Sequence, residues 1–395
     1  MLSEKRMFIL KLLFILLPLG VFSSIPIIFA IQMKETLSYE QLLDVQDPQC
    51  PLVLFEHRTS PGRIHFKIYN AVEREPEILV MGNSLMLTYR SGLLNENSSA
   101  FYNAATTGIS IDLLHFMVAE IFSQSESLPE LMLVGFDPAN FADPGISRSI
   151  PQLERENPAT LQTTYDSGIN SLLLAYERNY NFSQLLGLLE TDYSTSGELL
   201  YGYQSRFFEV GYRNDGSYRF AELDDAVALH RRQISFDTWF DPENTRQPVI
   251  SGDEVMPNPM YHAEQILQLA QENNVFVIGL LPSYMPSIEE YMAETGDYTY
   301  LPQAIEQLDT LFESYGFAFY SQADLPNMTF EDEVYFDGRH YSEATAAEIY
   351  LQFLADYPDL LGEYSSADWI QAQIDQAENP FDFFNEVICG DLSGQ

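Results

Sequence analysis

Two short motifs in this chain carry residue types that could perform nucleophilic chemistry. The segment EILVMGNSLM (77–86) runs apolar residues into Gly-Asn-Ser, so Ser84 would directly follow a buried strand. Near the other end, YFDGRHYSEAT (335–345) places Asp337 three residues before His340. A serine nucleophile needs a histidine to take its proton and a carboxylate to hold the second ring nitrogen of that histidine. The motifs therefore predict Ser84 as nucleophile, His340 as general base and Asp337 as the group that orients it.

Both motifs also have a plain structural interpretation. Gly, Asn and Ser are turn residues, and Asp-x-x-His pairs arise by chance in many chains. The position of the two motifs is the stronger signal, because one follows the first predicted strand and the other opens the final helix. Arg339, between the acid and the base, is expected to point away from them.

The residues around these motifs predict the sheet that must position them. Short apolar segments alternate with helical patterns over 110–124, 260–273 and 301–316, which predicts a doubly wound parallel α/β sheet of about five strands. In such sheets ligands bind beyond the carboxyl ends of the strands, so both motifs would meet at one edge. The predicted strands are 77–83, 101–105, 130–137, 275–282 and 317–321.

Acyl transfer also requires hydrogen-bond donors for an oxyanion. The backbone N–H of Ser84 is one candidate, and Gly108, after the second strand, is another because glycine lets the backbone approach a ligand closely. After the third strand, GFDPANF offers Asn140, whose amide can donate. Asp137 is the alternative in that segment, although an ionised carboxylate has no hydrogen to donate.

The alternation of strands and helices breaks between residues 141 and 259. That stretch is too long for a loop in a compact domain, so it is predicted as a partly helical insertion that could wall a substrate cleft. The predicted organisation is a cytoplasmic tail (1–11), a transmembrane anchor (12–32), a stalk (33–75), two core halves (76–140 and 260–358), the insertion (141–259) and a C-terminal tail (359–395).

The amino terminus predicts a membrane anchor. Residues 12–32 carry no charge, and about 20 apolar residues suffice to cross a bilayer. Basic residues precede this run and acidic residues follow it, so the large domain would be extracytoplasmic. A cleaved signal peptide is the alternative; its apolar region would be shorter and would end in a small-x-small site.

Composition limits the partners and cofactors. The formal net charge of −39 would repel nucleic acid. No phosphate-binding glycine loop and no metal-ligand cluster is visible, so no cofactor or metal is expected. The two cysteines, Cys50 and Cys389, could form a disulfide in an oxidising compartment, and two unpaired thiols are the alternative.

Four segments together resemble the SGNH/GDSL hydrolase superfamily: Gly-Asn-Ser at 82–84, Gly108, GFDPAN at 135–140 and the Asp337–His340 motif. The resemblance covers residues 76–140 and 258–358. It implies that Ser84, Gly108 and an asparagine of the third segment form an oxyanion hole. The third segment departs from the family, because Asp137 stands where the family has that asparagine.

A single anchor with an exported domain of this kind also resembles the DltD and alginate-acetylation proteins. That resemblance implies a serine esterase or O-acyltransferase that acts on acylated cell-surface glycan or polymer, beside a multi-pass membrane O-acyltransferase. The alternative is an inactive SGNH-shaped protein that binds a polymer or assembly partner.

Overall fold

The computed structural model divides the chain into two compact units, residues 1–62 with 154–214 and residues 63–153 with 215–395. The structure describes residues 4–46, 53–56, 62–95, 98–142, 161–177, 179–181, 183–184, 199–220, 232, 239–240, 249–321, 324–325, 328, 330–377 and 379–381.

The larger unit contains a five-stranded parallel sheet, as the sequence predicts. Its strands are β2 (Ile78–Met81), β3 (Phe101–Asn103), β4 (Leu131–Gly135), β8 (Phe276–Leu280) and β9 (Ala318–Tyr320). They lie in the order β3-β2-β4-β8-β9, with Val80 of β2 opposite Asn103 and Leu133. The strand order reverses direction between β2 and β4, and ligands bind at such a point in open α/β sheets.

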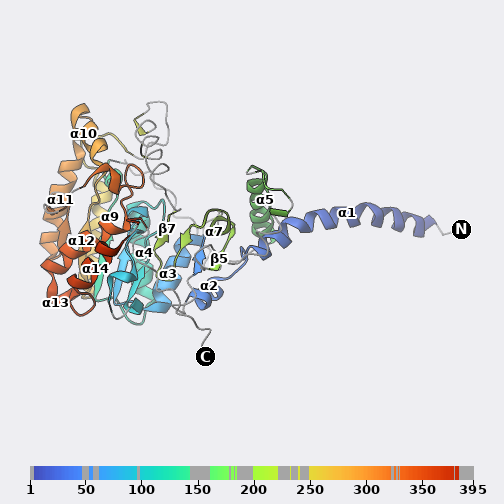
Figure 1. The fold of residues 1–395 in the computed structure, drawn as a ribbon, viewed down its shortest axis with the longest axis horizontal. Coiled ribbons are helices and arrows are strands. Elements are labelled where there is room, and N and C mark those ends of the chain that lie inside the picture. The colour runs from blue at the N-terminus through green and yellow to red at the C-terminus, as the bar shows by residue number, and fades with distance from the viewer. Residues whose placement is uncertain are drawn as a thin grey trace. The chain divides into compact units, whose positions relative to one another are not determined.

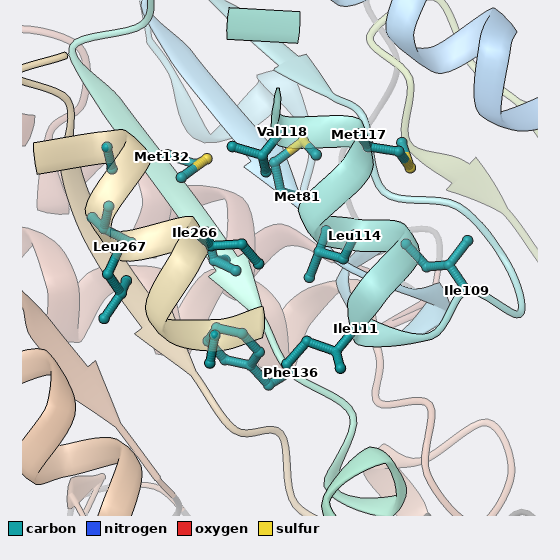
Figure 2. Close-up of a cluster of buried hydrophobic side chains, with 14 of the residues drawn as sticks. Met81, Ile109, Ile111, Leu114, Met117, Val118, Met132, Phe136, Ile266 and Leu267 are labelled. Atoms are coloured by element: carbon teal, nitrogen blue, oxygen red, sulfur yellow. The ribbon is translucent and has the colours of Figure 1, made fainter. Parts of the chain in front are cut away.

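Helices cover both faces of this sheet. The helices α4 (Ile111–Gln124), α9 (Pro257–Glu272) and α11 (Tyr300–Tyr315) share one apolar cluster with alternate side chains of the strands. Figure 2 shows part of it, with Leu114 and Val118 of α4 facing Ile266 of α9 over the sheet. On β9, Phe319 packs toward this cluster, so the next side chain, Tyr320, points to the opposite face. There its ring lies 4.8 Å from that of Phe353 in α12 (Glu343–Asp356).

Parts of the predicted stalk (33–75) and C-terminal tail (359–395) pack into this unit. Ile68 and Ala71 of α3 (Gly62–Arg74) belong to the core cluster, and Ile370 of α14 (Ala367–Gln376) is fully buried. Both segments therefore belong to the folded unit. Its remaining elements are η1 (Ser84–Met86), η2 (Ser91–Leu93), η3 (Ser98–Ala100), η4 (Pro138–Phe141), β7 (Tyr218–Arg219), α10 (Pro286–Thr295), η6 (Asp332–Val334) and α13 (Pro358–Leu361).

The smaller unit joins the amino-terminal segment to part of the predicted insertion, so that insertion is not a single piece. Helix α5 packs against the carboxyl-terminal part of α1 (Figure 1), and Gly168 sits so close to the carbonyl of Pro26 that a side chain has no room. Strand β1 pairs in parallel with β5 and antiparallel with β6. The elements are α1 (Glu4–Gln32), α2 (Tyr39–Gln46), β1 (Val53–Phe55), α5 (Leu161–Glu177), β5 (Leu199–Tyr201), α7 (Tyr203–Phe208) and β6 (Gly211–Tyr212).

Within the part of the chain that the structure describes, no helix combines the length and apolar character needed to cross a membrane. The predicted disulfide partners, Cys50 and Cys389, lie outside the described residues.

Candidate active site

Ser84 begins η1 immediately beyond β2, and two glycines make this close turn possible. Gly82 has φ +145°, a conformation that favours glycine. A Cβ at Gly82 would lie 2.6 Å from Cγ of Met86 and 2.8 Å from the carbonyl oxygen of Gly135. Gly135, at the end of β4, faces the same methionine side chain and also leaves no room for a Cβ. The Met86 side chain therefore lies against both strand ends and holds η1 at the sheet edge.

Two asparagines tie down the backbone around the nucleophile. Oδ1 of Asn83 accepts the N–H of Leu85 at 3.0 Å. Asn103, fully buried at the end of β3, donates from Nδ2 to the carbonyl oxygens of Met86 and Tyr89 at 2.7 and 2.9 Å. A buried amide whose donors are paired makes the local structure rigid. Hydrogen bonds of Asn83, in its own segment, and of Asn103, at the end of β3, therefore hold the backbone around Ser84 in place.

The structure brings His340 to Ser84 across 256 residues of sequence. Nε2 of His340 lies 2.8 Å from Oγ of Ser84, and Nδ1 of His340 lies 2.8 Å from Oδ2 of Asp337. The two ring nitrogens therefore face a hydroxyl and a carboxylate, the arrangement that a serine nucleophile and its general base require. When Nδ1 carries the hydrogen toward Asp337, Nε2 is free to accept the serine proton.

Asp337 is held as a carboxylate by the turn that carries it. Its Oδ1 accepts the backbone N–H groups of Arg339 and His340 at 2.9 and 3.0 Å. Burial by itself would raise the pKa of Asp337, but attraction to His340 and these hydrogen bonds outweigh burial and hold the pKa well below its usual range. The acid is therefore ionised at neutral pH and can stabilise an imidazolium.

Contacts on both sides of the turn fix its position. The N–H of Phe336 donates to the carbonyl oxygen of His340 at 2.6 Å, and the N–H of Met285 donates to that of Gly338 at 3.0 Å. After the turn, Glu343 in the first turn of α12 forms a buried ion pair with Arg90, at 3.1 Å from Nη1 to Oε2. Arg90 lies in the loop that follows η1, so this pair links the histidine segment to the serine segment.

Arg339 does not point away from the site, contrary to the sequence-based expectation. Its Nη1 donates to Oδ2 of Asp137 at 3.1 Å, and Nδ2 of Asn83 donates to the same oxygen at 2.6 Å. The other oxygen of Asp137 accepts the N–H of Ala139 at 3.0 Å. Asp137 therefore acts as an acceptor for three donors. Burial would lower the pKa of Arg339, but the negative charge of Asp137 raises it, so the guanidinium stays charged.

The other predicted oxyanion residues take different positions. The N–H of Thr106 donates to the carbonyl oxygen of Gly82 at 3.1 Å, which places the loop of Gly108 alongside the nucleophile segment. Gly108 has φ +69° and is exposed, with open space where a side chain would be. The N–H of Asn140 closes η4 on the carbonyl of Asp137 at 3.0 Å. The Asn140 side-chain amide makes no hydrogen bond to the described residues, the triad included.

The triad is shielded but not closed. Ser84 is 6% exposed, and the side chains of His340 and Asp337 are 12% and 21% exposed. The ring of Phe220 lies 5.6 Å from the imidazole of His340, centre to centre, and also contacts Phe336. Low exposure strengthens the electrostatic interactions within the site. No group of acidic, histidine or cysteine side chains suited to a metal ion occurs among the described residues.

Comparison with known proteins gives no match from which a function could be inferred, so the evidence for this site is its geometry. No family model matches the chain, and no curated protein shows a significant sequence match to it.

Sequence reasoning overlooked the contribution of Arg339 and Asn83. Asn83 directly precedes Ser84 and Arg339 directly precedes His340, so their positions inside the two motifs could have indicated a role in the site. Their convergence on Asp137 depends on the packing of β2, β4 and the turn at 337–340, which no spacing in the sequence encodes.

Proposed function

We propose that this protein is a membrane-anchored, extracytoplasmic serine esterase or O-acyltransferase of the SGNH type. One observation carries the proposal: the continuous hydrogen-bonded chain from Ser84 Oγ through His340 to Asp337 at the carboxyl edge of the parallel sheet. The resemblance of the motifs to SGNH hydrolases and the five-stranded parallel sheet support it. The substrate class is an acylated cell-surface glycan or related envelope polymer.

In the proposed reaction Oγ of Ser84 attacks the carbonyl carbon of an ester. His340 Nε2 takes the serine proton while Asp337 stabilises the resulting imidazolium. Collapse of the tetrahedral intermediate breaks the ester C–O bond, and Nε2 returns the proton to the departing alcohol. An acyl-enzyme is left on Ser84. Water or a sugar hydroxyl then attacks the acyl carbon and gives its proton to Nε2. Collapse of this second tetrahedral intermediate breaks the bond between the acyl carbon and Oγ of Ser84, Nε2 returns the proton to Oγ, and the free acid or the acylated sugar leaves.

We assign the stabilisation of the oxyanion to the backbone N–H of Ser84, the N–H of Gly108 and the guanidinium of Arg339. Ser84 is the first residue of η1, so its N–H has no partner within that helix. Arg339 binds the carboxylate that replaces the amide of the family pattern. One of its nitrogens contacts Asp137, and its side chain is 20% exposed, which leaves further N–H groups for a ligand.

The cellular setting is part of the same proposal. The uncharged run at 12–32, with basic residues before it and acidic residues after it, supports an anchor with the catalytic unit outside the membrane. A multi-pass membrane O-acyltransferase is the proposed partner that would supply or receive acyl groups. Protease treatment of intact spheroplasts should digest the catalytic unit, and protection of that unit would reverse the orientation.

The activity is tested with the full-length protein in detergent. Wild type should hydrolyse para-nitrophenyl acetate and become labelled by a fluorophosphonate probe, because that probe requires an activated serine. Ser84→Ala should lose both signals. Ser123→Ala is the matched control, since Ser123 is an exposed serine of α4 whose hydroxyl donates to the carbonyl of Glu120 in the same helix. Labelling that persists in Ser84→Ala would contradict the assignment.

A second candidate function rests on Asp137. A carboxylate in place of an amide donor places negative charge where an oxyanion would develop, which favours an inactive scaffold that binds polymer or an assembly partner. Folded wild-type protein that neither hydrolyses esters nor reacts with the fluorophosphonate would support this scaffold. The ion pair between Asp137 and Arg339 argues for the enzyme, because it offsets that negative charge.

A further inference from the structure

A cavity of about 470 Å³ lies between the end of β8, helix α10 and the start of helix α11. This volume is within the range of about 300–1,000 Å³ that is usual for small-molecule sites. Most of the side chains that line it are apolar. They include Leu281, Pro282, Met292, Leu301, Pro302 and Ile305.

The cavity and the candidate active site share structural walls. Pro138, which lines the cavity, directly follows Asp137, the acceptor for Arg339. Ser283, which also lines the cavity, has its Oγ 2.6 Å from the hydroxyl oxygen of Tyr335, at the start of the turn that carries Asp337 and His340. Two residues further, the N–H of Met285 donates to the carbonyl of Gly338, between the triad acid and base. The cavity therefore borders the turn that carries His340.

The charged group among the described lining residues is one carboxyl group, that of Glu289. Its Oε1 accepts the N–H of Tyr284 at 3.1 Å. Burial raises the pKa of Glu289 to about 7, against a weaker lowering by that hydrogen bond. Near neutral pH much of this carboxyl is uncharged. A mostly apolar lining with no cation among its described residues favours an uncharged hydrocarbon ligand over a sugar or an anion.

We propose that this cavity binds the hydrocarbon chain of the acyl group, so that the protein prefers esters of medium-length acyl chains to acetate esters. The inference rests on the proposed function and adds its substrate class. At about 30 Å³ per non-hydrogen atom, the volume that one water molecule occupies in the liquid, the cavity would hold at most about 15 such atoms. An octanoyl chain fits within this limit.

The first test compares para-nitrophenyl acetate, butanoate and octanoate with the full-length protein. Burial of the four additional methylenes should raise kcat/KM for octanoate over butanoate about 10- to 200-fold. Ala293→Trp places a bulky ring at the cavity mouth, where Ala293 is an exposed residue of α10, and should reduce octanoate hydrolysis while sparing acetate. The neighbouring Glu294→Trp is the matched control, because Glu294 is exposed and outside the lining.

The second test does not depend on catalysis. Full-length Ser84→Ala is irradiated with an octanamide that carries a diazirine on its terminal carbon, and the labelled peptides are mapped. Label on residues 281–305 that is lost in Ser84→Ala/Ala293→Trp supports the cavity. Acetate hydrolysis by wild type with a flat chain-length profile and no label on 281–305 would overturn the inference and leave the esterase standing. Label on 281–305 without hydrolysis of any ester would keep the cavity as an acyl-binding site and overturn the esterase.

Discussion

The pairing of Arg339 with Asp137 yields the most informative prediction about this site. If the guanidinium stabilises the oxyanion, Arg339→Ala should lower kcat without a comparable change in KM, because the interaction strengthens in the transition state. Loss of one oxyanion donor costs about 10²–10³ in kcat. The variant also leaves the carboxylate of Asp137 without its cation, so the loss should lie near 10³.

The size of the electrostatic contribution follows from the geometry. Nη1 and Oδ2 are 3.1 Å apart, and the two side chains are 20% and 10% exposed. At an effective dielectric constant of about 20 the gross attraction is about 5 kcal/mol, and desolvation of both groups offsets much of it. Removal of the cation alone should therefore destabilise the fold as well. Removal of both charges should restore much of that stability.

Three variants separate charge from simple loss of a side chain. Asp137→Asn should stay within about tenfold of wild type, because the new amide can donate as the resembled family's asparagine does. Arg339→Ala/Asp137→Asn should be about 10- to 100-fold faster than Arg339→Ala, since the repelling carboxylate is gone. Arg74→Ala, in the last turn of α3, is the control for loss of an arginine outside the site.

The assay is hydrolysis of para-nitrophenyl butanoate by full-length proteins, with Tm and circular dichroism to verify folding. A folded Arg339→Ala variant with kcat within threefold of wild type would refute the role of Arg339. A double variant no faster than Arg339→Ala would refute the charge argument and leave the arginine as a geometric donor.

Three further predictions address the triad, the sheet edge and the cavity. Asp337→Asn should lower kcat about 10⁴-fold, and adding His340→Ala should cost little more, because the pair acts as one unit; losses that multiply would contradict this. Gly135→Ala should cost about 1–3 kcal/mol of stability in urea unfolding by displacing η1, while Gly252→Ala, whose added carbon meets only ordinary contacts, should be nearly neutral. Folding raises the pKa of Glu289 from 4.5 to about 7, so the folded state binds this proton more tightly than the unfolded state does. The free energy of unfolding of wild type should therefore fall as the pH rises from 4.5 to about 7. The free energy of unfolding of Glu289→Gln, relative to that of wild type, should therefore rise by up to about 3 kcal/mol from pH 5 to pH 8. A difference that stays constant across this range would show that the carboxyl is not buried as described.

Several elements could be predicted because their signals are local. Apolar runs such as 130–137 are typical of a parallel strand that is buried on both faces. Gly316 ends α11 in the left-handed conformation that glycine favours. Ser342 accepts the N–H of Thr345 and caps α12, as its position before the helical pattern indicates. Helix α10 was missed although Pro286 at its first turn and Gly296 beyond its end are both recognisable boundary signals.

Other features depend on contacts between distant segments. In the smaller unit, α5 packs on α1 through Gly168. The hydrophobic periodicity of either helix does not indicate which segment it packs against. The segments α3 and α14 are short and amphipathic, and their partners are distant in sequence: α3 packs into the core cluster of the sheet and α14 packs on α12.

The amino-acid sequence by itself predicted the residue types of the proposed triad, the strands of the sheet and the edge of the sheet at which the two motifs meet. These follow from hydrophobic pattern and from the rule that parallel strands direct their carboxyl ends to one edge. Tertiary structure alone decided that His340 lies 2.8 Å from Ser84, that Arg339 turns toward Asp137, and that a cavity borders the turn at 337–340. Those outcomes depend on how side chains from β2, β4, β8 and α12 fill the space between them, and packing of that kind has no local signature in the chain.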